Sequence, residues 1–190
     1  MENTKKELRS KYKTLRQQLS ENEMEEMNLA IANQLLKLPI WDKSYFHIFL
    51  PIKENREIDT ELILHLLSGK DKEILISKSN FGTREMTHYL LTDNTKIKKN
   101  KYNIPEPVDG IEVPSKKIEV IFVPLLAFDK KGHRVGYGKG FYDKLLGECQ
   151  VETIKIGLSF FEAEELIIDD IHEEDKKLNY CVTPNSIYEF

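Results

Sequence analysis

Hydrophobic residues at helical spacing predict two helices at the start of the chain. The first series predicts a helix over residues 4–19 with one buried face. Its members are Leu8, Tyr12, Leu15 and Leu19. Ser20 and Glu23 have the spacing of a capping box, which predicts that a second helix begins there, and Pro39 marks its predicted end. The buried side of this helix should consist of Met24, Met27, Ile31, Leu35 and Leu38.

Four short apolar runs predict buried strands, at residues 45–52, 73–77, 118–126 and 153–159. Helical periodicity returns at residues 59–67, and we expect further helices after Gly140 and after Glu162. Such apolar strands, separated by helices, are typical of an α/β domain whose largely parallel sheet is covered on both faces. Residues 92–117 are polar and contain three prolines, so we expect a long irregular excursion over the surface.

Composition and charge exclude several classes of protein. With 190 residues, a formal net charge of -4 and 40% hydrophobic residues, the chain fits one globular domain spanning residues 1–190. The longest apolar run, residues 120–128, is far shorter than the roughly 20 residues of a membrane-spanning helix. Residues 1–9 show no secretory signal, and Cys149 and Cys181 lack a metal-binding spacing, which favours free thiols. We therefore expect a cytoplasmic monomer with neither nucleic acid nor membrane as partner.

Alternating glycines follow the third predicted strand. Gly136, Gly138 and Gly140 can adopt positive φ and expose consecutive backbone amides, to which the next helix adds its positive N-terminal end. Lys139 supplies a mobile positive charge, and Arg134 is suited to binding phosphate or bracing the loop. The segment predicts a phosphate cradle, although its spacing matches neither a P-loop nor a dinucleotide fingerprint. The alternative interpretation is a glycine-rich hairpin connector.

Other polar residues near these elements can be interpreted either as functional residues or as ordinary structural or surface residues. Asp143, early in the predicted helix, suits Mg²⁺ that bridges phosphates, but an acid there also interacts favourably with the helix dipole. The first predicted helix carries a basic stripe, which by itself indicates a solvated face. The stripe consists of Lys5, Arg9, Lys13 and Arg16. His47 and His65 lie in a predicted strand and helix, and neither a catalytic triad nor a zinc site is expected.

The most specific motif of the chain runs through the glycine loop. Residues 126–129 (Leu-Ala-Phe-Asp) precede Gly132-x-Arg134-x-Gly136-x-Gly138-Lys139-Gly140-x-Tyr142-Asp143. This arrangement resembles the signature of the 5-formyltetrahydrofolate cyclo-ligase family. Segments elsewhere agree with that family in the same order. They are Lys5-x-x-Leu8-Arg9, Glu57-Ile58-x-Thr60, residues 104–107 (Ile-Pro-Glu-Pro), and His172-x-x-Asp175 before Val182-Thr183. The resemblance implies a three-layer α/β/α sandwich with a mostly parallel central sheet, resembling the ribose-isomerase and CoA-transferase group.

The resemblance also implies a reaction, which is ATP-dependent cyclisation of 5-formyltetrahydrofolate to 5,10-methenyltetrahydrofolate with release of ADP and phosphate. The formyl oxygen is a poor leaving group, and its phosphorylation would let it depart when N10 attacks the formyl carbon. The implied ATP-binding residues are Lys5, Arg9, Arg134, Gly136, Tyr137, Gly138, Lys139, Gly140 and Tyr142. Lys139, Glu57 and Arg134 are implied to be catalytic, and Asp143 and Asp175 to hold Mg²⁺. The implied folate contacts are Glu57, Met86, Tyr102 and Tyr142.

Two other function classes remain as alternatives. A non-catalytic folate- or nucleotide-binding protein would keep the glycine loop without turnover, but it needs neither metal carboxylates nor a mobile lysine. An RNA-associated protein would use the lysine cluster of residues 96–101, which no RNA-binding motif accompanies.

Overall fold

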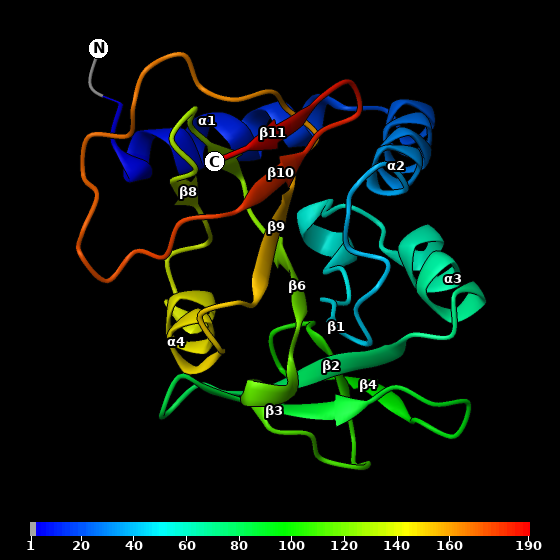
Figure 1. Cartoon of the computed structure of the whole chain (residues 1–190). Coiled ribbons are helices and arrows are strands. Elements are labelled where there is room, and N and C mark those ends of the chain that lie inside the picture. Colours follow the sequence, from blue (N-terminus) through cyan, green and yellow to red (C-terminus); the bar gives the residue numbers. More distant parts are fainter. Residues whose placement is uncertain (1–2) are drawn as a thin grey trace.

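The computed structural model describes residues 3–190, which Figure 1 shows as a ribbon. Its first two helices begin where side chains cap free amides. The α-helices of this part are α1 (Lys5–Gln18), α2 (Glu21–Leu35), α3 (Glu61–Gly69) and α4 (Phe141–Glu148), with short 3-10 helices at Lys53–Asn55 and Ser115–Lys117. The predicted capping box of α2 is confirmed: the Glu23 amide donates to Ser20 Oγ at 3.2 Å, and the Ser20 amide donates to Glu23 Oε2 at 2.7 Å. Thr4 and Glu7 form a second box at α1, which we did not predict.

A seven-stranded sheet forms the centre of the molecule, in the order β11-β10-β9-β6-β1-β2-β3. Its strands are β1 (Tyr45–His47), β2 (Glu73–Asn80), β3 (Glu85–Leu90), β6 (Val120–Pro124), β9 (Ile154–Leu158), β10 (Tyr180–Val182) and β11 (Ile187–Glu189). The five inner strands run parallel, and the edge strands β3 and β11 run antiparallel to their neighbours. The prediction of an α/β fold with a mostly parallel sheet is confirmed.

Both faces of the sheet are covered, because side chains alternate between them along each strand. On β6, Val120 and Phe122 pack in the apolar cluster that includes α2 and α3, whereas Ile121 and Val123 pack in the cluster that includes α4. Figure 1 shows α2 and α3 on one side of the sheet and α4 on the other. Leu8 and Tyr12 of α1 join a third cluster with Ala127.

The order of the strands creates a crevice beside β1. The chain passes from β1 to β2 and β3 on one side and then returns to place β6 on the other side of β1. Connections therefore leave the carboxyl ends of β1 and β6 in opposite directions, which is where open α/β sheets bind ligands. No helix within residues 3–190 has the length and hydrophobicity needed to cross a bilayer.

The helix predicted after Glu162 is wrong. Residues 162–178 contain no helix, because their polar groups bond to other segments. The Glu164 amide donates to the Phe128 carbonyl oxygen at 2.8 Å, and the Glu164 carboxylate accepts from Tyr12 Oη at 2.6 Å. The Ile168 amide donates to the buried Asp129 carboxylate at 3.1 Å. These contacts hold the segment against α1 and the loop after β7.

Several strand boundaries also differ from the predictions. The run at residues 45–52 forms a ladder only as far as His47, after which the chain leaves the sheet. The run at residues 118–126 shortens to Val120–Pro124, where Pro124 offers no amide to the ladder. The excursion of residues 92–117 is less irregular than expected, because it contains the hairpin of β4 (Ile97–Lys99) and β5 (Pro105–Pro107). A second short hairpin, β7 (Ala127–Phe128) and β8 (Arg134–Val135), leads into the glycine loop.

Candidate functional site

A cavity of about 450 Å³ lies at the carboxyl ends of β1 and β6. Residues 48–50, which follow β1, and Pro124, the last residue of β6, form part of its wall. All the site residues named from the sequence line this one cavity. They are Lys5, Arg9, Glu57, Met86, Tyr102, Arg134, Gly136, Tyr137, Gly138, Lys139, Gly140, Tyr142, Asp143 and Asp175. The fold therefore brings together segments that lie up to 170 positions apart in the chain.

The cavity also has lining residues that the sequence analysis did not assign to a site. They include Lys13, His47, Ser77, Ser79, Phe81 and Phe141. Lys13 was recognisable, because it continues the helical spacing of Lys5 and Arg9 on one face of α1. His47 and Ser77 carried no such signal, since only the register of β1 and β2 places them on the same face of the sheet.

The glycine loop has the left-handed backbone that was predicted, but at two positions rather than three. Gly138 has φ +82° and Gly140 has φ +74°, whereas Gly136 does not lie in the left-handed region. Gly140 precedes the first turn of α4, and no side chain within residues 3–190 caps that turn. The first amides of α4 are therefore available to an anion, with the positive end of the helix behind them.

Arg9 joins α1 to this loop. Its Nε donates to the Gly136 carbonyl oxygen at 2.8 Å. A Cβ atom on Gly138 would lie 3.3 Å from Arg9 Cζ, so the guanidinium packs against the glycine backbone. Because the Arg9 side chain lines the cavity, its other guanidinium N–H groups are suited to binding an anion there.

Arg134 braces the opposite side of the loop. Its Nη2 donates to Asp143 Oδ1 at 2.6 Å, its Nη1 donates to the Lys176 carbonyl oxygen, and its side chain is only 6% exposed. Burial lowers the pKa of Arg134, and the neighbouring Asp143 carboxylate opposes that shift. Of the two roles considered for Arg134, the contacts favour bracing, because both terminal nitrogens are already bonded within the protein.

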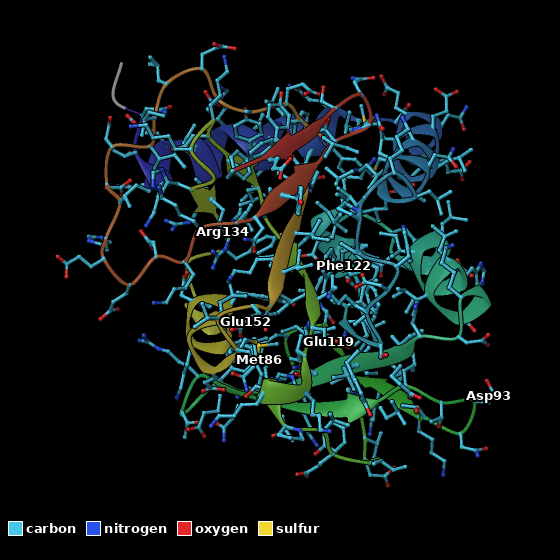
Figure 2. The ribbon with its side chains drawn as sticks, viewed as in Figure 1. Met86, Asp93, Glu119, Phe122, Arg134 and Glu152 are labelled. Atoms are coloured by element: carbon cyan, nitrogen blue, oxygen red, sulfur yellow. The ribbon has the colours of Figure 1, made fainter. Side chains whose placement is uncertain are left out.

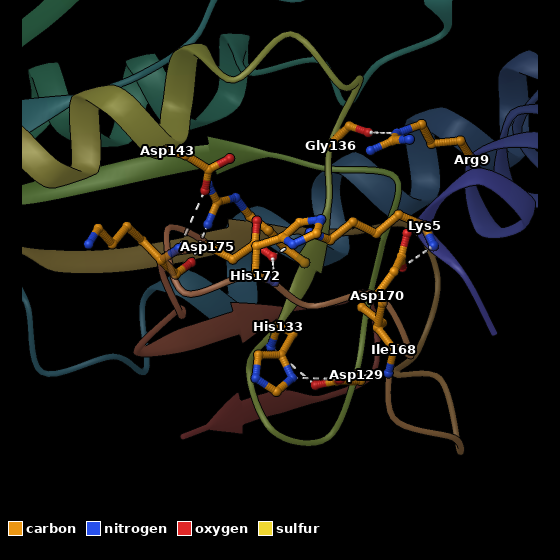
Figure 3. A network of polar contacts seen from close by, with 12 residues as sticks. Lys5, Arg9, Asp129, His133, Gly136, Asp143, Ile168, Asp170, His172 and Asp175 are labelled. Atoms are coloured by element: carbon orange, nitrogen blue, oxygen red, sulfur yellow. Dashed lines mark hydrogen bonds and ion pairs between the residues drawn. The ribbon is translucent and has the colours of Figure 1, made fainter.

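In each of the two predicted metal carboxylates, one oxygen accepts hydrogen bonds from both a cationic side chain and a backbone amide. Asp143 Oδ1 accepts from Arg134 and from the Lys176 amide, while Asp175 Oδ2 accepts from Lys5 Nζ and from the His172 amide (Figure 3). Although burial acts to raise it, the pKa of Asp175 is lowered by the His172 amide and the Lys5 ammonium, so its carboxylate form is favoured.

The donor set at these carboxylates fits Mg²⁺ bound together with phosphate. Within residues 3–190, the other oxygen of each carboxylate, Asp143 Oδ2 and Asp175 Oδ1, accepts no hydrogen bond. The same part of the chain has no group of three or more His, Cys, Asp or Glu side chains that could hold a metal ion. Mg²⁺ commonly uses one or two carboxylates and completes its coordination with water and phosphate oxygens, so two carboxylates suffice.

Glu57 is a buried carboxyl group in the loop after β1. Its Oε2 accepts from the Ile52 amide at 2.7 Å. Burial raises the pKa of Glu57, although the Ile52 amide, Tyr137 and Arg16 act in the opposite direction. Arg16, itself buried, donates from Nη1 to Tyr137 Oη at 2.5 Å. A carboxyl group whose pKa is raised in a cavity is suited to proton transfer.

Met86 extends from β3 and is labelled in Figure 2. It lines the cavity, as do the aromatic side chains of Phe81, Tyr102 and Phe141. The ring of Phe81 lies 4.2 Å from that of Tyr102 and 5.0 Å from that of Phe141, measured between centroids. Tyr102 is 47% exposed. Burial and the Glu57 carboxylate raise the pKa of Tyr142, which keeps its hydroxyl protonated. Apolar and aromatic walls with a few polar groups are typical of sites for flat organic ligands.

Comparisons with known proteins agree on one family. The profile of the 5-formyltetrahydrofolate cyclo-ligase family matches residues 1–184. The chain is 29% identical over 167 residues to the 5-formyltetrahydrofolate cyclo-ligase of Haemophilus influenzae, covering 83% of this chain and 87% of that protein. It is also 29% identical over 170 residues to the enzyme of that name from Mus musculus, covering 83% of each chain. The solved structure of Aquifex aeolicus 5,10-methenyltetrahydrofolate synthetase matches with a TM-score of 0.83 at 28% identity, covering 97% of this chain and 92% of that one.

Proposed function

The chain belongs to the 5-formyltetrahydrofolate cyclo-ligase family, and we propose that its cavity is the active site for that family's reaction. The protein is an enzyme that cyclises 5-formyltetrahydrofolate to 5,10-methenyltetrahydrofolate at the expense of ATP. One observation carries the assignment of the site. The site residues that the family resemblance implies, from widely separated parts of the chain, all line the same cavity.

The chemical problem of this reaction is the formyl oxygen. In the first step that oxygen attacks the γ-phosphorus of ATP, and the bond from phosphorus to the oxygen of ADP breaks. In the second step N10 attacks the formyl carbon and loses its proton, and the carbon–oxygen bond breaks as inorganic phosphate leaves. The enzyme must align the γ-phosphate with the formyl oxygen and compensate the negative charge that moves between them.

We propose that the basic side of the cavity binds the triphosphate. Lys5 and Arg9 extend from α1, and Lys139 lies between two left-handed glycines at the start of α4. The free first amides of α4 provide neutral donors for a phosphate oxygen. Lys139 is exposed and lines the cavity, so its ammonium group is free to follow the γ-phosphate as that group is transferred. Arg134 holds the loop in place through Asp143.

Mg²⁺ belongs to the same proposal. Asp143 and Asp175 would hold the ion, which would supply positive charge to compensate that of the phosphates. The carboxylate of Asp143 also orients Arg134, and that of Asp175 orients Lys5. The two acids therefore position cationic side chains that line the cavity.

We propose that the other side of the cavity binds the folate. Met86, Tyr102 and Tyr142 offer apolar and aromatic surface for a flat ring. Glu57 supplies a buried carboxyl group with a raised pKa, which suits it to hydrogen bonding with ring nitrogens and to accepting the N10 proton. A protein that only binds its ligands has no use for this proton acceptor together with a mobile lysine.

A direct assay tests the function. Purified protein is mixed with 5-formyltetrahydrofolate and Mg·ATP, and the ultraviolet absorbance of the methenyl product is followed. We expect the absorbance to rise in proportion to the ADP formed. We expect no rise in absorbance when ATP is omitted. A flat trace from folded protein would refute the ligase function, and binding of both ligands without product would favour the non-catalytic alternative.

We further propose that residues 1–190 act as one monomeric domain in the cytoplasm. The family match over residues 1–184 supports a single functional unit. Cys149 and Cys181 are both free, and Cys181 is buried, which suits a reducing compartment. Sedimentation equilibrium of the purified protein with and without ATP measures the oligomeric state, and a dimer at micromolar concentration would contradict this part of the proposal.

A further inference from the structure

Three polar side chains form a chain of hydrogen bonds on the face of the sheet that lines the cavity. His47 Nε2 lies 2.6 Å from Ser77 Oγ, which lies 2.7 Å from His88 Nδ1. The residues belong to β1, β2 and β3, where Ser77 and His88 are direct cross-strand partners. His47 and His88 are 0% and 3% exposed, whereas Ser77 is only partly buried and lines the cavity. His47 also lines the cavity but is fully buried, so Ser77 is the member of this chain that is most exposed to a ligand.

The two histidines determine what Ser77 can offer to a ligand. A serine hydroxyl has one donor and two acceptor sites, and a neutral imidazole presents either N–H or a bare nitrogen. Burial lowers the pKa of His88 to about 4 and that of His47 well below its usual value, so both rings are neutral at neutral pH. If Ser77 donates to one ring and accepts from the other, it keeps one acceptor site. If both rings donate, its own O–H is free to donate.

The histidine nitrogens that face away from Ser77 do not determine which of these two hydrogen-bond arrangements Ser77 adopts. His47 Nδ1 and His88 Nε2 are buried and have no hydrogen-bond partner within residues 3–190. No carboxylate therefore fixes either tautomer, in contrast to a catalytic triad, where an acid orients the histidine. His47 also packs edge-on to Tyr142 at 6.2 Å between centroids, next to the ring surface assigned to the folate.

From this geometry we propose that Ser77 is a specificity-determining contact for the bicyclic ring of the folate, with His47 and His88 as positioning residues that act through it. The inference rests on the proposed function. The pterin ring carries N–H donors and acceptors along its edge, so a buried group of matching polarity discriminates it from apolar rings of the same size. Ser77 hydrogen bonds to a ring N–H when it keeps an acceptor site, and the histidine tautomers adjust to that arrangement.

A kinetic test separates Ser77 from residues that bind ATP. We expect Ser77→Ala to raise the KM for 5-formyltetrahydrofolate about tenfold, the effect of losing about one hydrogen bond, while the KM for ATP stays unchanged. His65→Gln and Ser68→Ala, both on the exposed side of α3, are matched controls and should change neither constant. Equal changes in both KM values, or no change in either, would overturn the proposal.

A spectroscopic test needs no variant and stays valid if Ser77→Ala fails to fold. The ¹⁵N shifts of the imidazole nitrogens report the tautomers of His47 and His88 in the wild-type protein. Addition of 5-formyltetrahydrofolate without ATP should shift the Ser77-facing nitrogens, whereas a non-hydrolysable ATP analogue alone should not. Unchanged shifts with saturating folate would refute the contact. If the shifts stay unchanged but the same sample forms the methenyl product after ATP is added, the Ser77 contact is refuted while the ligase function stands.

Discussion

Arg9 Nε donates to the Gly136 carbonyl oxygen at 2.8 Å, so the first helix of the chain is bonded to the glycine loop 127 positions later. The contact explains why a basic residue that resembles ordinary surface charge in the sequence is held beside the cavity. It also fixes the loop from outside, while Arg134 fixes it through Asp143. A loop braced from two sides loses little further entropy when it binds phosphate.

Gly138→Ala tests the packing of this contact. A Cβ atom at φ +82° is strained and would lie 3.3 Å from Arg9 Cζ, so we expect the free energy of unfolding to fall by about 1–2 kcal/mol. Gly136→Ala is the matched control, because no atom lies within 4 Å of its added Cβ and its φ is not left-handed. Urea denaturation of both variants measures the difference. Equal stability of the two variants would contradict the close approach of Arg9.

Lys139→Ala tests the proposed stabilisation of the transferred phosphate. We expect kcat to fall by about 100- to 1000-fold, as when a single charge-stabilising donor is removed, while the far-ultraviolet circular dichroism stays unchanged. Lys131→Ala removes an exposed lysine that does not line the cavity and serves as the control. A Lys139→Ala enzyme with wild-type kcat would show that the loop lysine does not contact the reacting group.

Asp175→Asn tests the metal assignment. The change removes a proposed carboxylate ligand of Mg²⁺ and leaves Lys5 without its ionic partner, so we expect a higher Mg²⁺ concentration for half-maximal rate, about tenfold or more. Glu165→Gln, which loses an exposed pair with Lys130, controls for the general loss of an acid. The rate of each variant is measured as a function of Mg²⁺ concentration at saturating ATP. An unchanged Mg²⁺ dependence in Asp175→Asn would remove Asp175 from the metal site.

Glu57→Gln should alter the pH dependence of stability. Burial raises the pKa of Glu57 above its usual 4.5. At a pH between the pKa of the unfolded state and that of the folded state, the folded state therefore binds more protons than the unfolded state. The contribution of Glu57 to the free energy of unfolding is therefore present at low pH and is lost as pH rises from about 4.5 through the folded pKa.

The Glu57→Gln variant has no carboxyl group to titrate, so it does not lose this stability as pH rises. Its free energy of unfolding relative to that of the wild type should therefore increase as pH rises from about 4.5 through the folded pKa. We also expect its turnover to fall about 100-fold or more. Denaturant unfolding at a series of pH values measures the first effect, and the product assay measures the second. A difference in stability that does not vary with pH would contradict the raised pKa.

Local pattern alone was sufficient for much of the fold. The steps of four and three between Leu8, Tyr12 and Leu15 predicted α1, and Ser20 with Glu23 predicted the start of α2, because both signals act within one or two helical turns. The parallel strands β1, β2, β6 and β9 were likewise apparent from uninterrupted apolar runs, whereas the parallel strand β10 was not predicted. Edge strands such as β3 and β11 were not, since they are less apolar and depend on their neighbours for pairing.

Tertiary structure decided the boundaries and the partners. The segment after Glu162 did not become a helix, because Asp129 and Tyr12 bond to it from outside. The glycine motif marked, within the sequence, a loop that lines the cavity, and family resemblance extended the candidate site to distant residues. Only the folded sheet placed Ser77 between His47 and His88, because register, which joins residues far apart in the chain, determines which side chains share a face.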